Sequence, residues 1–195
     1  MTDNNTITAT TILKSQNPEL FKELSWVLLA RSKDEFRPHL SGCLIKTEGD
    51  NKIIAATNGA SLHQVTYTGS FSTGLPDGNY TAITVNKDVI ALTPNSNEFP
   101  KYEHIMPVKK TQIMTIELRD LPYKRRKKHA DTSWSILYTR MVRAIKHDDK
   151  FTISIDALKL SIVDDENFNV FHNEAGDPVL FENEKRMFLI GGLRM

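Results

Sequence analysis

The chain has 195 residues, of which 39% are hydrophobic and 25% charged, with a formal net charge of +1. The length allows one domain or two small ones, and the near-neutral charge excludes a polybasic nucleic-acid binder or an acidic tail. Cys43 is the only cysteine, which excludes an internal disulfide and a cysteine-rich zinc site.

The sequence opens without the basic and apolar segments of a signal peptide, and no apolar run reaches membrane-spanning length. Together with the single cysteine, this predicts a soluble, cytoplasmic protein without membrane contact.

The first hundred residues read as strands around one clear helix. Asn17-Pro18-Glu19 is a typical helix start, with an Asn cap, a first-turn Pro and an acidic residue. The predicted elements are a strand at 6–13, a helix at 18–31, strands at 62–67 and 80–85, and a short helix at 87–92 capped by Asn86 and stopped by Pro94.

Residues 36–62 read as a hairpin and a second tight turn. Leu40, Cys43 and Ile45 alternate with polar residues in the first strand, and 48–51 supplies a polar turn. Asn58-Gly59 then marks a sharp turn after the second strand.

After residue 107 the composition changes. A basic run at 124–129 cannot be buried and predicts a solvated loop. The predicted elements are strands at 112–118 and 151–155, helices at 132–147 and 156–163, and strands at 168–171, 179–181 and 187–190.

No constellation of catalytic residues stands out. The histidines show no ligand spacing, no phosphate-binding glycine loop or nucleophile elbow is present, and Cys43 lies in an apolar strand. We therefore predict a protein that is not an enzyme and that has no cofactor and no metal.

Three separated segments resemble the bacterial DNA polymerase III β subunit, the sliding clamp. They are an Arg-Pro-x-Leu-x-Gly strand with a following Thr-Asn-Gly-x-x-Leu turn (Arg37 to Gly42 and Thr57 to Leu62), the segment Phe99 to Pro107, and the terminal Leu193-Arg194-Met195.

The resemblance implies an α+β, DNA-clamp-like fold of antiparallel sheets with helices packed on one face. It divides the chain into two abridged clamp domains, 1–108 resembling the central domain and 109–195 resembling the C-terminal one. An amino-terminal clamp domain is expected to be absent, as in a shortened phage or mobile-element version.

The resemblance also implies a hydrophobic pocket for a short peptide of a polymerase or another replication protein. Its lining would be Leu40, Thr57, Gly59, Leu62, Pro100, Ile105, Leu189, Leu193, Arg194 and Met195. Ala60-Ser61 replaces the family's usual His-Arg, and Gly191-Gly192 replaces Met-Pro. The pocket would therefore be wider, less polar at one lip, or altered in specificity. The alternative interpretation is that the aliphatic members are simply core.

Contact with duplex DNA, without sequence preference, would need a diffuse basic surface. The candidates are Lys124, Arg125, Arg126, Lys127, Lys128, Arg140, Arg143 and Lys146. The last three lie opposite the apolar face of helix 132–147. The alternative is a solvated amphipathic helix beside a charged loop.

Two functions remain open at this point. The first is a sliding-clamp-like processivity factor that forms a homo-oligomer around duplex DNA during replication. The second is a clamp-like protein-interaction module without a ring, which binds and modulates a replication or transcription partner.

Overall fold

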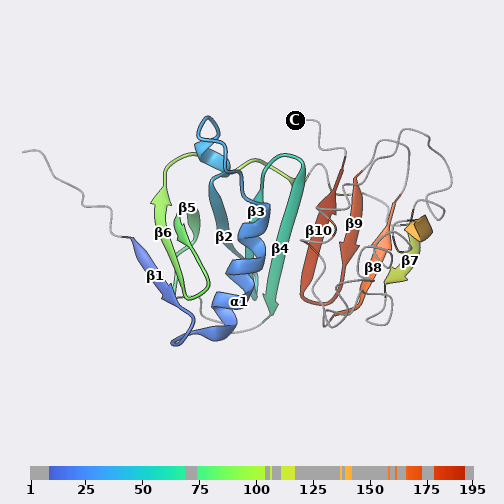
Figure 1. Cartoon of the computed structure of the whole chain (residues 1–195), viewed down its shortest axis with the longest axis horizontal. Helices are drawn as coiled ribbons and strands as arrows, with labels where there is room; N and C mark the ends of the chain where they lie inside the picture. Colours follow the sequence, from blue (N-terminus) through green and yellow to red (C-terminus); the bar gives the residue numbers. More distant parts are fainter. Residues whose placement is uncertain are drawn as a thin grey trace, which may run out of the picture. The chain divides into compact units, whose positions relative to one another are not determined.

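The computed structural model describes residues 9–68, 74–103, 106, 111–116, 137, 139–141, 158, 161, 166–172 and 178–191. The chain divides into two compact units, Met1–Pro100 and Lys101–Met195, and each has its own strands (Figure 1). The division falls slightly before the 108/109 boundary expected from the sequence, and equating the units with clamp domains stays a prediction.

The first unit is built on an antiparallel sheet with the strand order β1-β6-β5-β2-β3-β4. Its strands are β1 (Thr10–Leu13), β2 (Gly42–Glu48), β3 (Asn51–Thr57), β4 (Ser61–Thr68), β5 (Gly78–Val85) and β6 (Val89–Asn95).

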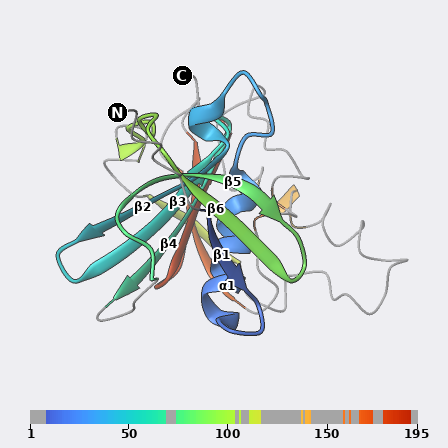
Figure 2. The ribbon, with the colours of Figure 1, turned by 90° about the vertical axis from the view of Figure 1, so that its left-hand side faces the viewer.

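Helix α1 (Pro18–Val27) covers one face of this sheet and is followed by a 3-10 turn, Leu28–Ala30 (Figures 1 and 2). The Asn17 side chain accepts a hydrogen bond from the Leu20 amide at 3.2 Å, and Pro18 opens the first turn. The predicted cap is therefore confirmed. The buried side of the helix carries Leu20, Phe21, Leu24 and Val27, which form a core with Ile45, Ile54, Val65, Ile90 and Leu92 of the strands.

The predicted hairpin at the centre of the unit is confirmed. β2 and β3 pair from Leu44 opposite Ala55 to Glu48 opposite Asn51, and the turn uses Gly49 at a φ of 58°. β3 and β4 then pair across a tight turn in which Gly59 has a φ of 89°. Both glycines supply a left-handed conformation that other residues rarely adopt.

The predicted helix at 87–92 is wrong, because strand β6 begins at Val89 and residues 87 and 88 lie in the turn before it. Asn86 does cap, but it caps a hairpin: its Oδ1 accepts hydrogen bonds from the amides of Asp88 at 3.0 Å and Val89 at 2.8 Å. Along β6 Ile90 and Leu92 are buried while their neighbours are half-buried, the two-residue period of a strand. Pro94 pairs with Tyr80 of β5 and lies two residues beyond Leu92, where the pairing of β6 with β1 ends.

A second correction concerns Leu40, which was predicted in a strand. Pro38–Leu40 is a 3-10 turn, closed by the Leu40 amide donating to the Arg37 carbonyl at 2.9 Å. Pro38 favours this geometry because its ring fixes φ at a helical value. Strand β2 begins only at Gly42.

The second unit has an antiparallel sheet with β7, β8, β9 and β10 as successive neighbours. These are β7 (Gln112–Ile116), β8 (Phe168–Phe171), β9 (Val179–Glu182) and β10 (Arg186–Ile190), all at predicted positions. Phe188 stacks on Phe181 with centroids 4.3 Å apart and meets Phe168 edge-on at 5.3 Å.

Helical residues of the second unit are described only in part. Leu137 and residues 139–141 are helical, as are Leu158 and Ser161. Of these, Leu137, Met141, Leu158 and Ser161 are buried. The predicted strand at 151–155 lies outside the described residues. The predicted α+β class with antiparallel sheets is confirmed.

Candidate functional site

The turn between β3 and β4 carries three of the predicted pocket residues and is fixed by its own side chains. Thr57 Oγ1 donates to the Ser61 carbonyl at 2.7 Å and accepts from the Gly59 amide at 3.1 Å. Asn58 Oδ1 accepts from the amides of Ala60 at 2.8 Å and Ser61 at 2.9 Å. The turn is thus preorganised, as a binding site benefits from being.

The Pro38–Leu40 turn is held just as firmly. The Leu40 carbonyl accepts from the Ser32 amide at 2.8 Å, and Ser41 Oγ donates to the Pro38 carbonyl at 2.7 Å. Next to it, a Cβ on Gly42 would overlap the backbone of Tyr80, so β2 and β5 approach closely only because this residue is glycine.

The aliphatic pocket candidates that the structure describes are buried. Leu40, Leu62 and Leu189 have no exposed surface, Thr57 is buried, and Pro100 is half-buried. Such burial is what the core interpretation expects of the leucines. Ile105, Leu193, Arg194 and Met195 lie outside the described residues. That these residues share one pocket stays a prediction.

Of the predicted DNA contacts, only Arg140 is described. It is exposed on a helical segment whose Leu137 and Met141 are buried, the amphipathic arrangement that was expected at these positions. Lys124, Arg125, Arg126, Lys127, Lys128, Arg143 and Lys146 lie outside the described residues. Helix α1, by contrast, exposes one acidic and one basic side chain, Glu19 and Lys22.

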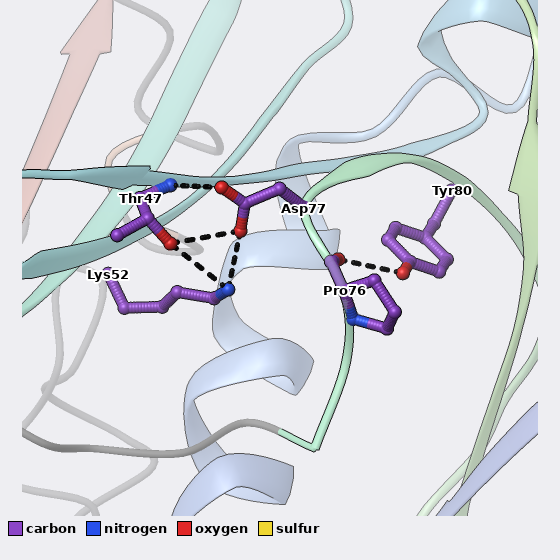
Figure 3. A network of polar contacts seen from close by, with 5 residues as sticks. All are labelled: Thr47, Lys52, Pro76, Asp77 and Tyr80. Atoms are coloured by element: carbon purple, nitrogen blue, oxygen red, sulfur yellow. Dashed lines mark hydrogen bonds and ion pairs between the residues drawn. The ribbon is translucent and has the colours of Figure 1, made fainter.

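A polar network ties the loop before β5 to the β2–β3 hairpin (Figure 3). The Asp77 carboxylate accepts from Lys52 Nζ at 2.5 Å, from the Thr47 amide at 2.8 Å and from Thr47 Oγ1 at 3.0 Å. The bond from Lys52 is the main reason why the pKa of Asp77 is lowered. Nearby, the Tyr80 hydroxyl donates to the Pro76 carbonyl at 2.8 Å.

A second network, which sequence reasoning missed, lies in the second unit. Arg186 is almost fully buried and pairs with Glu166, whose other oxygen accepts from Asn183 Nδ2 at 2.7 Å. Asn183 Oδ1 also caps the β9–β10 turn by accepting from the amides of Lys185 and Arg186. A buried arginine gives no signal in a single sequence.

Glu166, Asn183 and Lys185 of this network also border an open hollow of about 610 Å³. It is lined by Glu166, Asn167, Asn169, Glu182, Asn183, Glu184 and Lys185. Among the residues that the structure describes, no group of three or more His, Cys, Asp or Glu side chains could hold a metal ion.

Burial shifts the pKa of two side chains in the interior of the first unit, Cys43 and His63. Burial raises the pKa of the Cys43 thiol to about 12, so the thiolate that would react is absent at neutral pH. Burial also lowers the pKa of His63 to about 4, against a smaller opposing effect of its bond to the Trp26 carbonyl. No described helix is long and apolar enough to cross a membrane.

The architecture is similar to that of several solved protein structures. The β subunit of DNA polymerase III from Streptococcus pneumoniae matches with a TM-score of 0.62 and 14% identity, covering 100% of this chain and 67% of the other. The Thermotoga maritima β subunit matches with a TM-score of 0.59 and 11% identity, covering 100% and 68%. The chain has the sliding-clamp fold.

The same fold relates the chain to the β subunit from Borrelia burgdorferi, at a TM-score of 0.58 and 14% identity over 98% of this chain and 64% of that one. The chain thus spans about two thirds of these clamp subunits. No family model and no curated protein sequence matches it, so the likeness to clamps lies in the fold.

Proposed function

We propose that the chain is a sliding-clamp-like processivity factor, which assembles around duplex DNA and tethers a replication protein by a short peptide. The observation that carries the proposal is the clamp fold over the whole chain, 98–100% of it in the three comparisons above. The protein would act by tethering, without catalysis.

The strand order supports assembly. Among the described strands, β1 lies at one edge of the first unit's sheet and β7 at one edge of the second unit's. An edge strand presents backbone groups that can pair with another chain. Ring closure needs contacts between subunits, and exposed strand edges of this kind are what such contacts would use.

The test is the native mass of the full chain across a concentration series, followed by retention on circular and linear duplex DNA. A discrete oligomer that survives dilution and is retained on circular DNA but slides off linear DNA is the expected result. A monomer at every concentration, or equal retention on both DNAs, contradicts an encircling clamp.

Peptide docking at the β3–β4 turn can be tested with a labelled peptide that bears leucine and phenylalanine. Ala60 is exposed beside Gly59, so Ala60→Glu should leave the fold intact. We expect it to weaken the peptide's Kd by about tenfold, or 1.4 kcal/mol, and removal of Leu193 to Met195 to do the same. Thr68→Glu, exposed at the far end of β4, is the matched control. Unchanged affinity in the first two variants would reject this site.

The alternative, a protein-interaction module without a ring, is favoured by one observation. Phe36 is 94% exposed, on a turn fixed by the Asp34 carboxylate accepting from the Phe36 amide at 3.0 Å. The Asp34 carbonyl also accepts from the Arg37 amide at 3.0 Å. A preorganised, exposed aromatic side chain is typical of a protein-docking anchor. The native-mass measurement separates the two functions.

A further inference from the structure

Asn58-Gly59 is the only Asn-Gly pair in the chain, and this dipeptide is chemically labile. The Gly59 backbone nitrogen can attack Cγ of the Asn58 side chain, since glycine has no side chain to obstruct the approach. A bond forms between that nitrogen and Cγ, the bond from Cγ to the side-chain nitrogen breaks, and the proton of the attacking N–H passes through solvent to that nitrogen, which leaves as ammonia. Water then opens the succinimide at either carbonyl, which gives aspartate or isoaspartate.

Both reacting groups are tied down in the folded turn. The N–H of Gly59, which must lose its proton for the attack, donates to Thr57 Oγ1 at 3.1 Å. Gly59 is buried and sits at a φ of 89°. The Asn58 side chain, which must swing toward that nitrogen, is held by its Oδ1 to the amides of Ala60 and Ser61.

The Thr57 side chain, at the end of β3, fixes the positions of both Gly59 and Ser61. Its hydroxyl donates to the Ser61 carbonyl at 2.7 Å while it accepts from Gly59, and that same carbonyl accepts from the Asn58 amide at 3.3 Å. We propose that Asn58-Gly59 is a latent deamidation site, which the folded turn keeps unreactive through the Thr57 hydroxyl and which reacts when the β3–β4 turn opens locally.

The product would change the fold at this point. Isoaspartate adds one backbone carbon between β3 and β4, where Thr57 pairs with Leu62 at the turn. A lengthened main chain cannot keep both that pairing and the Asn58 cap. Deamidated protein would therefore accumulate irreversibly as the turn opens. This inference does not depend on the proposed clamp function.

The experiment follows conversion of Asn58 by peptide mass spectrometry, with isoaspartate counted separately, in mildly alkaline buffer. The full chain is compared folded and in urea. We expect slow conversion in the folded protein and fast conversion in urea. Thr57→Val keeps the shape of the side chain and removes the hydroxyl. It should speed conversion in the folded protein about fivefold, the shift expected from losing the bond to the Gly59 amide at typical strength. Thr57→Ser should restore the slow rate.

Two control variants distinguish the effect of the Thr57 hydroxyl from the effect of a general loss of stability. Ile54→Val shortens a buried side chain of β3 away from the turn, and Thr68→Val makes the same chemical change at an exposed position. Neither should alter the rate. Equal rates in the folded and unfolded wild type, no effect of Thr57→Val, or equal acceleration by Ile54→Val would overturn the proposal. If Thr57→Val does not fold, the proposal is tested by hydrogen exchange in the wild type. We expect the Gly59 amide to be protected from exchange in the folded protein. An unprotected Gly59 amide would refute the mechanism.

Discussion

The imidazole of His63 is enclosed between β4 and helix α1. It stacks on Trp26 with ring centroids 4.5 Å apart, and its Nδ1 lies 2.9 Å from the Trp26 carbonyl. With the pKa lowered from 6.5 to about 4, the folded protein disfavours the charged form. The stabilising effect is complete above pH 6.5 and is lost as pH falls toward 4, which amounts to about 3 kcal/mol.

His63→Phe should remove this part of the acid sensitivity, because phenylalanine can stack on Trp26 but cannot take up a proton. The measurement is the free energy of unfolding by urea at several pH values between 7 and 4. The variant is expected to be less stable than the wild type at neutral pH, because it lacks the bond to the Trp26 carbonyl. Its free energy of unfolding should also fall less steeply as the pH is lowered. An identical decline in both proteins would mean that other groups cause it.

Gly42 is the residue with the least room for a side chain, since a Cβ would overlap the Tyr80 carbonyl in β5. Gly42→Ala must push two paired strands apart, and we expect a loss of about 3 kcal/mol in the free energy of unfolding. Gly49→Ala is the matched control, because it has open space and carries only the cost of its φ of 58°, about 1 kcal/mol. If both variants lose the same free energy of unfolding, the cost of Gly42→Ala comes from backbone conformation and not from contact with β5.

Individual elements were predictable where two independent signals agreed. Helix α1 has both a cap at Asn17 and an apolar face, and the β2–β3–β4 strands have turn glycines between alternating residues. At Asn86 the signals conflicted. Asparagine caps helices and turns by the same side-chain bonds. Whether a helix or a strand follows Asn86 therefore depends on the pairing of β6 with β5 and β1. The pairing with β1 joins residues that are far apart in the sequence.

The Asn86 turn offers a test at this scale. Asn86→Ala removes the acceptor for the amides of Asp88 and Val89 and should lower the free energy of unfolding by about 1 kcal/mol. Lys87→Ala, in the same turn with a side chain that is 90% exposed, should change it by less than about 0.5 kcal/mol. Thermal or urea unfolding of both variants makes the comparison, and equal effects would show that the cap contributes nothing.

The candidate site was less predictable than the fold. The family motif drew attention to Thr57 and Gly59, whose bonds the structure explains, but it could not tell a pocket leucine from a core leucine. Leu40, Leu62 and Leu189 are fully buried, and burial depends on packing partners far away in the sequence. Arg186 was missed for the same reason, since its Glu166 partner is twenty residues away.

For the whole molecule, the decisive question is where DNA could be held. α1 exposes balanced charges, Glu19 and Lys22, so in the proposed clamp the predicted basic residues of the second unit are the better candidates for contacting the phosphates. Replacing Arg140, Arg143 and Lys146 together by Glu should abolish retention on circular duplex DNA without unfolding the chain. In a simple binding assay, the slope of log affinity against log salt should fall by about 3, since each lost phosphate contact removes roughly one unit.

Lys22→Glu is the matched control for that triple variant, because it reverses an exposed charge on a helix of the first unit. It should leave both the retention and the salt slope unchanged. If the triple variant keeps the wild-type slope, these three side chains do not contact DNA, and the alternative of a solvated amphipathic helix at the predicted 132–147 segment is favoured. If Lys22→Glu weakens retention as much as the triple variant, the effect is one of net charge, and the clamp would have no localised DNA-binding surface.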